Sequence, residues 1–415
     1  MRIIVVGGGI AGLVTALSLH AAGFSPLVHE SAREIHAVGV GINLLPHAVR
    51  ELTELGLGDE LAAIGLPPRE LLYCDRAGER VWSEPLGIVA GYRWPQYSVH
   101  RGRLQLMLLA AVRQRMGEDA VRTGMSFQRC EQHPAGVRAH FVDRRSGAEC
   151  VEEADVLVGA DGIDSVLRAQ LYPGEGLTHA NGVHMWRGVS EYPHILGGRT
   201  IVVAGGRPGS KFVAYPLVDP PAEGGNALMN WVLEIRKEEG AGALDRSNRP
   251  IRTSEALERL SGWKLPWIDL PALIGGSTGI YEYPMLDRDP LPRWSFDRVT
   301  LLGDAAHPMF PMGMNGGSQS IVDARVLAWC LTRESDPARA LLRYEAMRRE
   351  PLNRLVLANR QLGPEKIIAL AEDCGGELPR ERAESVSREY KRLAGCTAEG
   401  LNDRHSWSTS PVRFH

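Results

Sequence analysis

The sequence has little of what would indicate a metal site, a disulfide framework or a nucleic-acid-binding surface. It has six cysteines, the closest of which are 20 residues apart, so there is no CxxC pair of the kind that binds zinc. The net charge is only −3 and only five residues are lysine, which gives no electrostatic reason to bind nucleic acid or an anionic membrane. We therefore expect a globular protein of the reducing cytoplasm that has no metal and binds neither nucleic acid nor a membrane.

One N-terminal segment lacks charged residues altogether. Residues 3–28 contain no Asp, Glu, Lys or Arg, as a signal peptide or a membrane helix would. Five glycines interrupt this segment, however, and a single arginine precedes it, so a glycine-rich turn inside a globular domain is the better interpretation. At 415 residues the chain is long for one hydrophobic core, and two interleaved domains are expected.

The same segment has the pattern of a dinucleotide-binding turn. Ile3–Val6 is a β-branched run typical of a strand buried on both faces, and Gly7, Gly9 and Gly12 follow it as GxGxxG. These glycines allow the turn, let the backbone approach a pyrophosphate, and let the next helix pack on the strand. Glu30, eighteen residues after Gly12, is placed to accept hydrogen bonds from a ribose. The pattern predicts a bound dinucleotide but does not distinguish NAD from FAD.

Two later segments repeat the order of apolar strand, glycine-rich turn and helix. Val156–Val158 leads into "GADG" with Asp161, and Val299–Leu302 leads into "GDAAHPMFPMGMNGGSQ" with Asp304. Three such strand ends meet only if one sheet is assembled from distant segments. For Asp161 the alternative is an ordinary turn that caps a helix. There is no second GxGxxG, so a nicotinamide nucleotide has no Rossmann half of its own.

The three motifs, in this order, resemble those of the FAD-dependent class A aromatic monooxygenases of the para-hydroxybenzoate and salicylate hydroxylase type. The resemblance covers roughly residues 1–355. Four further stretches, "GVGINLLPHAV", "QYSVHRGRLQ", "MWRGV" and "YPMLDRDPLPRW", are similar to family members of phenazine pathways.

The resemblance implies an α/β fold in which a Rossmann-like FAD-binding domain with a mainly parallel sheet is interleaved with a substrate domain built on an antiparallel sheet. The FAD-binding domain would comprise residues 1–72, 98–178 and 284–355, and the substrate domain residues 73–97 and 179–283. Runs such as "TIVVAG", "KFVAYPLV" and "ALMNWVLEI" are typical of strands of the second sheet. Residues 356–415 would form a C-terminal segment with one or two surface helices, and residues 401–415 a loosely held tail.

The resemblance also implies which residues bind FAD non-covalently. Asp304 would bind the ribityl chain, and a helix that begins near Asn315 would offer free N–H groups to the negative charge of the reduced flavin ring. The full set implied for the cofactor is Gly7, Gly9, Ile10, Ala11, Gly12, Glu30, Arg33, Arg101, Gln105, Asp161, Gly303, Asp304, Gly313, Asn315 and Gly316.

In this family the substrate lies between the flavin and the second sheet. Arg187 is the most informative candidate, because a buried guanidinium needs an anion and could bind a substrate carboxylate with two hydrogen bonds. For the aromatic candidates, core packing is the alternative. The implied substrate residues are Gly41, Met185, Arg187, Tyr215, Tyr283 and Pro311. Pro311, Met312 and Gly313 would form the pocket beside the flavin ring, and no residue is assigned as an acid or a base. Met309, Met312 and Met314 could be an adaptable pocket wall or only packing.

The implied activity is hydroxylation of an aromatic or heteroaromatic acid in secondary metabolism or aromatic catabolism. NADPH or NADH would reduce FAD and leave, and the reduced flavin would activate O2 as a C4a-hydroperoxide that the aromatic ring attacks. Oxidative decarboxylation could accompany the hydroxylation. The ring system, the choice of reductant and the choice between monomer and homodimer stay open. The alternative is a flavin oxidase or reductase that does not hydroxylate, or an FAD-binding redox protein.

Two other features predict different chemistry. "GGSTG" at 275–279 matches the GxSxG motif of hydrolases, but a nucleophile elbow has a strand before it and a helix after it, whereas "IYEYP" resembles a strand. His307 could bind a metal, but no second ligand stands at a suitable spacing, and we expect it to bond a loop backbone instead.

Overall fold

The first sheet joins the three strands that carry the motifs. The computed structural model describes residues 1–176, 178–205, 210–221, 225–237, 249–376 and 378–409. The sheet has the order β19 (Ser295–Phe296), β20 (Val299–Leu301), β12 (Val156–Gly159), β1 (Ile3–Val6), β2 (Leu27–Glu30) and β8 (Val121–Thr123). All neighbours are parallel except β19 and β20. The carboxyl ends of β20, β12 and β1 therefore lie side by side, as predicted, although the three strands are far apart in sequence.

Helix α1 (Ile10–Ala21) connects the first glycine motif to the rest of this core. It packs between α4 (Arg101–Met116) and α8 (Gly316–Leu331). The close approach of α1 to β1 requires Gly12, because a Cβ atom there would lie 1.9 Å from the Gly7 carbonyl oxygen. The third glycine of the motif is thus fixed by packing, as its position predicts.

The second sheet is large and almost wholly antiparallel. Its order is β17 (Arg249–Pro250), β18 (Ser277–Asp287), β13 (His179–Tyr192), β16 (Ala227–Arg236), β15 (Ser210–Val218), β14 (Thr200–Gly205), β5 (Glu70–Cys74) and β6 (Arg80–Pro85). Only β14 and β5 run parallel. The three apolar runs predicted as strands are β14, β15 and β16, so that prediction and the predicted α/β class are confirmed.

The two faces of this sheet differ because successive side chains point to opposite sides. Trp186, Phe212 and Trp231 belong to the face that is buried against α6 (Thr253–Arg259) and α7 (Leu270–Gly275). Their neighbours in the chain, such as Met185 and Val232, belong to the opposite face, which the core clusters place elsewhere. This second face is the one that faces the candidate site.

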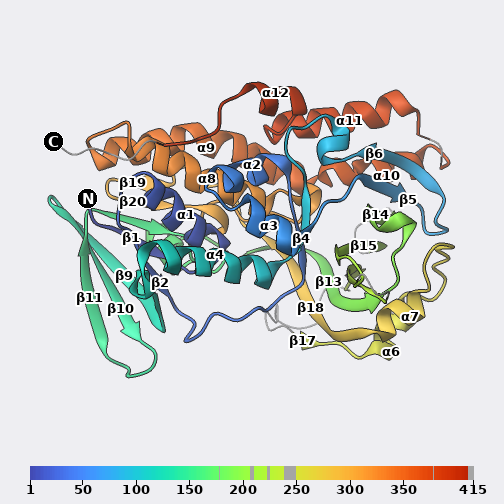
Figure 1. Cartoon of the computed structure of the whole chain (residues 1–415), viewed down its shortest axis with the longest axis horizontal. Helices are drawn as coiled ribbons and strands as arrows, with labels where there is room; N and C mark the ends of the chain where they lie inside the picture. The colour runs from blue at the N-terminus through green and yellow to red at the C-terminus, as the bar shows by residue number, and fades with distance from the viewer. Residues whose placement is uncertain (177, 206–209, 222–224, 238–248, 377, 410–415) are drawn as a thin grey trace.

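Two smaller sheets were not expected from the sequence. One has the order β11 (Glu149–Ala154), β10 (Gly136–Asp143), β9 (Met125–His133), and it projects at the lower left of Figure 1. The other has the order β3 (Gly41–Leu44), β7 (Tyr97–His100), β4 (Gly65–Leu66). The remaining helices of this half are α2 (Pro46–Glu54), α3 (Gly58–Ile64) and α5 (Val166–Leu171). Short 3-10 turns occur at η1 (Gly87–Ala90), η2 (Glu118–Ala120), η3 (Leu196–Gly198), η4 (Gly303–Ala305), η5 (Met312–Met314) and η6 (Gly363–Glu365).

The C-terminal segment is more extensive than the predicted one or two surface helices. Figure 1 shows its helices along the upper edge of the molecule: α9 (Pro337–Arg360), α10 (Lys366–Asp373), α11 (Arg380–Leu393) and α12 (Ala398–Asp403). Ile367, Ile368 and Ala383 are buried in one cluster with Leu71 and Tyr73 of β5. These helices therefore pack on the second sheet and bury apolar side chains against it, so they are not surface helices only.

The prediction of a loosely held tail over 401–415 is wrong for its first part. The guanidinium of Arg50 donates hydrogen bonds to the carbonyl oxygens of Leu401 and Arg404, at 3.1 and 2.8 Å. The Trp407 ring packs edge-to-face on Trp329, with 5.4 Å between ring centroids. Residues 410–415 lie outside the described part of the chain.

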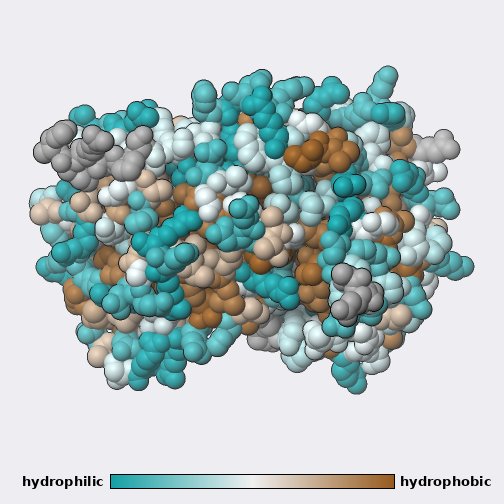
Figure 2. All heavy atoms as spheres, viewed as in Figure 1, coloured by the Kyte–Doolittle hydropathy of each residue, from teal (hydrophilic) through white to brown (hydrophobic). Residues whose placement is uncertain are grey.

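The surface in Figure 2 shows hydrophobic residues in separate patches between hydrophilic ones. Within the described residues, no helix combines the length and the apolar character that crossing a bilayer requires. The division into two interleaved domains stays a prediction, and its boundaries at 72/73 and 283/284 fall inside β5 and β18.

The Gly12 contact gives a direct test of the packing of α1. We expect Gly12→Ala to lower the free energy of unfolding of the apoprotein by ~1–3 kcal/mol or more, because the new methyl group has no space. Urea denaturation measures the change. Gly174→Ala is the matched control, since a Cβ at Gly174 meets no atom within 4 Å. Equal stability of Gly12→Ala and the wild type would contradict the close packing of α1 on β1.

Candidate active site

A cavity of about 390 Å³ joins the strand ends of the first sheet to the face of the second sheet that is opposite Trp186 and Trp231. Its wall contains predicted residues from both sets. From the cofactor set it includes Gly9, Ile10, Ala11, Arg101, Asp304, Asn315 and Gly316, and from the substrate set Gly41, Met185, Arg187, Tyr215 and Pro311. The two predicted sites are thus parts of one continuous space.

The glycines at the cavity fall into two groups. Gly7 has φ +104°, and a Cβ atom there would lie 2.4 Å from the Ala160 carbonyl oxygen, so the chain's own geometry requires glycine. A Cβ at Gly9 or Gly316 would meet no protein atom within 4 Å. Packing does not require glycine at these two positions, and the open space beside both suits the close approach of a ligand to the backbone.

Two helix N-termini open on this space. α1 begins after Gly9 and α8 begins at Gly316, which confirms the predicted helix start, and neither has a side-chain cap. The first N–H groups of each helix therefore have no partner within the helix and carry the positive end of its dipole. A dinucleotide with a pyrophosphate and a flavin ring that becomes negative on reduction fits this pair of termini.

Asp304 lies in η4, directly after β20, and lines the same cavity. No hydrogen bond from the described residues reaches its carboxylate. The side chain is open to the cavity, yet it lies deep among protein atoms, and this burial raises the pKa of Asp304, while His307 and Arg101 act in the opposite direction. A carboxylate without a protein partner is suited to accept hydrogen bonds from ligand hydroxyl groups.

Three predicted cofactor residues do not line the cavity: two of them bond the glycine loop, and the third lies elsewhere. Glu30 accepts hydrogen bonds from the N–H groups of Gly8 and Ala32, at 2.7 and 2.6 Å. Gln105 donates to the Gly8 carbonyl oxygen at 2.8 Å, so both side chains hold the loop in place. Arg33 is exposed and donates to the Arg144 carbonyl oxygen at 2.7 Å, away from the cavity wall.

Asp161 acts as a helix cap in the structure. Its Oδ2 atom accepts hydrogen bonds from the N–H groups of Val166 and Leu167, at 2.9 and 3.3 Å. Its Oδ1 atom is buried without a partner among the described residues, and burial raises the pKa of this carboxyl. The cavity itself is lined by the neighbours Ala160 and Gly162. The helix-capping alternative thus accounts for one carboxylate oxygen and leaves the other available.

A buried arginine ties the second motif to the third. Arg168 of α5 donates to the carbonyl oxygens of Ala305 and Ala306, at 3.1 Å each, and it pairs with Glu175. Since Asp304 immediately precedes these carbonyls, the Arg168 guanidinium fixes the turn that carries the Asp304 carboxylate.

The expectation that His307 bonds a loop backbone is wrong. Its Nε2 atom lies 2.5 Å from Oδ2 of Asp323 on α8, and the Arg348 guanidinium lies 2.6 Å from the other carboxylate oxygen. Burial alone would raise the pKa of Asp323, but Arg348 and His307 outweigh it and lower that pKa. This buried network anchors the loop to α8 and α9. The described residues contain no group of three potential metal ligands.

"GGSTG" does not form a nucleophile elbow. Residues 270–275 are helix α7, and Ser277 begins β18, so the order of helix and strand is the reverse of an elbow. The Ser277 hydroxyl lies 2.8 Å from that of Ser190 and accepts from Trp231 Nε1 at 3.0 Å. Ser277 is therefore a packing residue of the second sheet.

Arg187 enters the cavity from β13 with a largely unpaired guanidinium. One Nη2 hydrogen bond goes to the Gly41 carbonyl oxygen at 2.9 Å, while Nε is buried without a partner in the described part of the chain. No carboxylate of the described residues pairs with it. Burial lowers the pKa of Arg187, and Tyr215 and Tyr283 partly oppose this. The pKa of Tyr215 is raised by burial to about 12, so its hydroxyl stays neutral at pH 7.

The pocket residues beside the third motif separate into different environments. Pro311 lines the main cavity, whereas Met312 is buried with Phe310 and Met285 and lines no part of it. Tyr283 packs against the same cluster rather than lining the cavity. Of the other methionines, Met309 lines the main cavity, and Met314 lines both this cavity and a smaller one.

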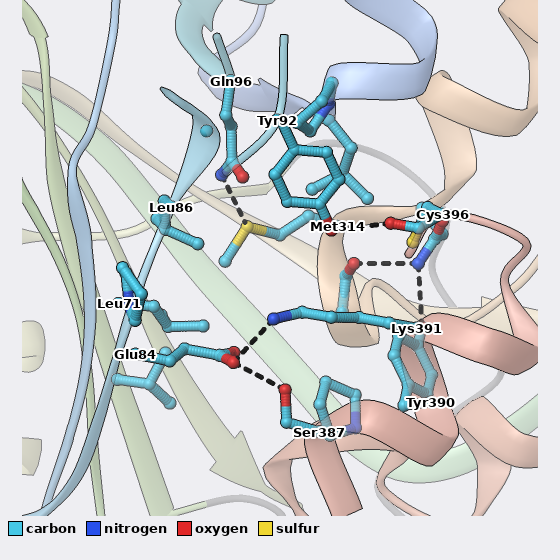
Figure 3. A pocket seen from close by; sticks show the side chains of 18 of the residues that line it. Leu71, Glu84, Leu86, Tyr92, Gln96, Met314, Ser387, Tyr390, Lys391 and Cys396 are labelled. Atoms are coloured by element: carbon cyan, nitrogen blue, oxygen red, sulfur yellow. Dashed lines mark hydrogen bonds and ion pairs between the residues drawn. The ribbon is translucent and has the colours of Figure 1, made fainter. Parts of the chain in front are cut away.

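A smaller cavity, of about 70 Å³, shares Met314 with the main cavity and is shown in Figure 3. Met314 has φ +61° and its sulfur accepts a hydrogen bond from Gln96 at 3.7 Å. Glu84 faces Lys391 and Ser387 across the cavity, at 2.7 and 2.5 Å. Gly313 belongs to this smaller space, and a Cβ there would collide with the Tyr390 hydroxyl at 2.3 Å.

Sequence reasoning missed three charged residues of the main cavity, Lys211, Glu234 and Glu365. Lys211 and Glu234 stand inside the apolar runs of β15 and β16, and a charge in such a run is a signal that could have been used. Glu365 gives no such signal, because it comes from η6 in the polar C-terminal segment.

Residues 1–358 match the FAD binding domain family. The chain is 46% identical over 385 residues to the phenazine 1,6-dicarboxylic acid hydroxylase PhzS of Lysobacter antibioticus, covering 89% of this chain and 94% of that protein. It is 33% identical to the 3-hydroxybenzoate 6-hydroxylase 1 of Aquipseudomonas alcaligenes, covering 84% of each chain. The crystal structure of Klebsiella pneumoniae HpxO with FAD and uric acid matches with a TM-score of 0.74 and 26% identity, covering 97% of this chain and 96% of that one.

The position of Asp304 predicts separate effects on ligand retention and on stability. We expect Asp304→Ala to weaken FAD binding by about 10- to 100-fold, the loss of a hydrogen bond to a charged group. The free energy of unfolding of the apoprotein should not fall, because this carboxylate makes no hydrogen bond with the described residues and its burial disfavours the charged form. FAD titration and urea denaturation measure the two quantities, with the exposed Asp119→Ala as control. Unchanged FAD affinity would contradict the assignment.

Proposed function

Because the chain belongs to the FAD binding domain family, we propose that it hydroxylates an aromatic or heteroaromatic carboxylic acid that binds beside Arg187. The predicted family is confirmed by the match over residues 1–358 and by the named monooxygenase relatives. The protein is an FAD-dependent aromatic monooxygenase, which uses FAD, O2 and a reduced nicotinamide nucleotide. We propose that the reductant is NADPH or NADH.

The observation that carries the substrate proposal is the unpaired guanidinium of Arg187 in the cavity that also contains Asp304. A partly buried arginine without a protein carboxylate is stabilised by an anionic ligand. Gly41 fixes the guanidinium from one side: its carbonyl oxygen accepts from Arg187, and its N–H donates to Asn230 at 2.7 Å. The Tyr215 hydroxyl is a further polar partner of the guanidinium, and Nε is left without a partner among the described residues, so it is available to a substrate carboxylate.

Bound FAD supplies the activated oxygen, and the residues of this chain supply orientation and a dry environment. Asp304 and the N-termini of α1 and α8 would hold the cofactor, and Arg187 would hold the acid group of the substrate. The second sheet contributes an apolar part of the cavity wall, formed by Val213, Val232 and Met185. An aromatic ring can lie against these side chains without water. No side chain of the cavity is needed as a nucleophile.

The extended wall of the cavity and the relatives support a fused-ring acid. The 46%-identical relative is named for a phenazine dicarboxylic acid, and other relatives are named for benzoic acids with a single ring. A cavity of about 390 Å³ must hold both the flavin ring region and the substrate, and its wall continues along four strands of the second sheet, β13, β16, β15 and β14. We favour hydroxylation with loss of the carboxylate as CO2 where the attacked carbon carries it. We also propose that the enzyme is cytoplasmic, because its reductant is an intracellular nucleotide. We propose that it is a monomer or a homodimer.

The test of this activity is incubation of the FAD-loaded enzyme with NADH or NADPH, ¹⁸O2 and a panel of naphthoic, quinoline and phenazine carboxylic acids. Substrate-stimulated oxidation of the nucleotide and one ¹⁸O atom in the product, found by mass spectrometry, are the expected results. Measured CO2 decides between decarboxylation and simple hydroxylation. Oxidation of the nucleotide that yields only hydrogen peroxide across the whole panel would contradict the proposal and favour a flavin oxidase.

The role of Arg187 has its own test, which compares a carboxylic acid with its carboxamide. For the wild type we expect the acid to bind about 10- to 100-fold more tightly than the amide, as for a charge-assisted hydrogen bond. Arg187→Gln should remove most of this preference, as measured by calorimetric titration of the FAD-loaded enzyme. The control is Arg252→Gln, a position that is 85% exposed on the same half of the molecule. A preference that survives in Arg187→Gln would contradict the assignment.

A further inference from the structure

A buried ionic cluster forms part of the cavity wall at a distance from Arg187. It consists of Lys211 from β15, Glu234 from β16 and Glu365 from η6, and is here called the lysine–glutamate cluster. Lys211 Nζ lies 2.5 Å from Glu234 Oε1 and also contacts Glu365 Oε2. The three side chains are 6%, 3% and 12% exposed, so these charges have little contact with bulk water.

Strand pairing fixes where the cluster lies relative to Arg187. Lys211 pairs with Glu234, and Glu234 pairs with Met185 across β16 and β13. The next row on the same face begins with Arg187, which pairs with Val232, and continues to Val213. Two strand spacings and one two-residue step separate Lys211 from Arg187, roughly 12 Å between Cα atoms. The wall of the cavity thus carries the positive charge of Arg187 at one end and the lysine–glutamate cluster at the other. The apolar side chains of Val232 and Val213 continue the row that begins with Arg187.

The cluster has hydrogen-bond acceptors left over but no donors. An ammonium group has three donors, and those of Lys211 are directed to Glu234, Glu365 and the sulfur of Met312 at 3.6 Å. Glu234 Oε2 and Glu365 Oε1 receive no hydrogen bond from the described residues. The cluster can therefore accept hydrogen bonds from a ligand, but it has no free donor to offer.

The charges of the cluster are also unequal. Burial alone would lower the pKa of Lys211, but the two carboxylates outweigh it and raise that pKa, so the lysine stays charged. Two carboxylates and one ammonium give a formal excess of one negative charge. Burial raises the pKa of Glu365, Glu234 acts in the same direction, and the Lys211 ammonium acts against them, because two carboxylates share one buried cation. Glu234 alone would neutralise the charge of Lys211 in a purely structural ion pair, so the second carboxylate, Glu365, is not needed for charge balance.

We propose that the lysine–glutamate cluster is a specificity site that binds an O–H or N–H group of the substrate at the end of its ring system remote from the carboxylate. This inference rests on the proposed function, and it narrows the substrate to aromatic acids that carry a hydrogen-bond donor far from the acid group. It also implies selection against a second carboxylate at that end, because like charges in a buried site repel each other.

The test uses three ligands that differ only at the remote end: 6-hydroxy-2-naphthoate, 6-methoxy-2-naphthoate and naphthalene-2,6-dicarboxylate. Calorimetric titration of the FAD-loaded wild type should show the hydroxy acid binding at least about 10-fold more tightly than the methoxy acid. The dicarboxylate should bind more weakly than the hydroxy acid. Equal affinity for the hydroxy and methoxy acids would overturn the proposal, and this comparison needs no variant.

Two variants identify the cluster as the cause of the preference. In Glu234→Gln and Glu365→Gln, the preference for the hydroxy acid should fall to a few-fold, because a neutral amide is a weaker acceptor than a carboxylate. Both variants should bind the dicarboxylate more tightly than the wild type does. The control is Glu389→Gln, an exposed position on α11. A full preference in both cluster variants would overturn the proposal.

The same titrations separate this proposal from the proposed function. If Arg187→Gln weakens all three ligands and the wild type still shows no preference for the hydroxyl group, the cluster proposal alone fails. If the wild type binds none of the three acids and hydroxylates no member of the acid panel, the proposed function fails as well.

Discussion

The adjacency of β20, β12 and β1 is the constraint on which the rest of this structure depends. Each strand ends in a glycine-rich turn, and the parallel pairing of the three strands brings these turns to one edge. That edge gathers the N-terminus of α1, the Asp304 turn and the start of α8 around one cavity. A backbone that must approach a cofactor closely cannot carry side chains there, and Gly9 and Gly316 are the positions where only that requirement explains the glycine.

Chemistry at this edge requires a second wall, and the large sheet provides it. Its alternation puts Trp186 and Trp231 into the packing with α6 and α7, and it turns Met185, Arg187 and Val232 toward the cavity. The C-terminal helices then cover this sheet. They deliver Glu365 to Lys211, so a segment that carries no cofactor motif contributes to the wall of the site.

The sequence predicts the parts of the site whose signal is local. A β-branched run, GxGxxG and a helix lie within about twenty residues of each other, and the structure agrees with each of them. Arg187 was likewise predictable, because an arginine inside an apolar strand needs a reason. Roles set by tertiary contacts were not predictable in the same way. His307 bonds a carboxylate on α8, Met312 is core, and Tyr283 turns out to pack beside the pocket.

Other features have no local signal at all. The sheet β9–β10–β11 interrupts the expected order of strands and helices. Burial alternates along β11, but the apolar residues do not follow it, since Val151 is exposed and Glu152 is half-buried. Glu365 lies in a polar segment whose composition is that of an ordinary surface helix, yet it is buried against Lys211. Pairings between residues so far apart in sequence depend on the whole fold, and a single sequence does not contain them in readable form.

The central claim is that one cavity holds the cofactor at Asp304 and the acid group of the substrate at Arg187. A crystal structure of the FAD-loaded enzyme with 2-naphthoate tests it most directly. The account predicts ribityl hydroxyl groups within hydrogen-bonding distance of the Asp304 carboxylate and the naphthoate carboxylate on the Arg187 guanidinium. A ribityl chain away from Asp304, or a naphthoate bound without contact to Arg187, would contradict it.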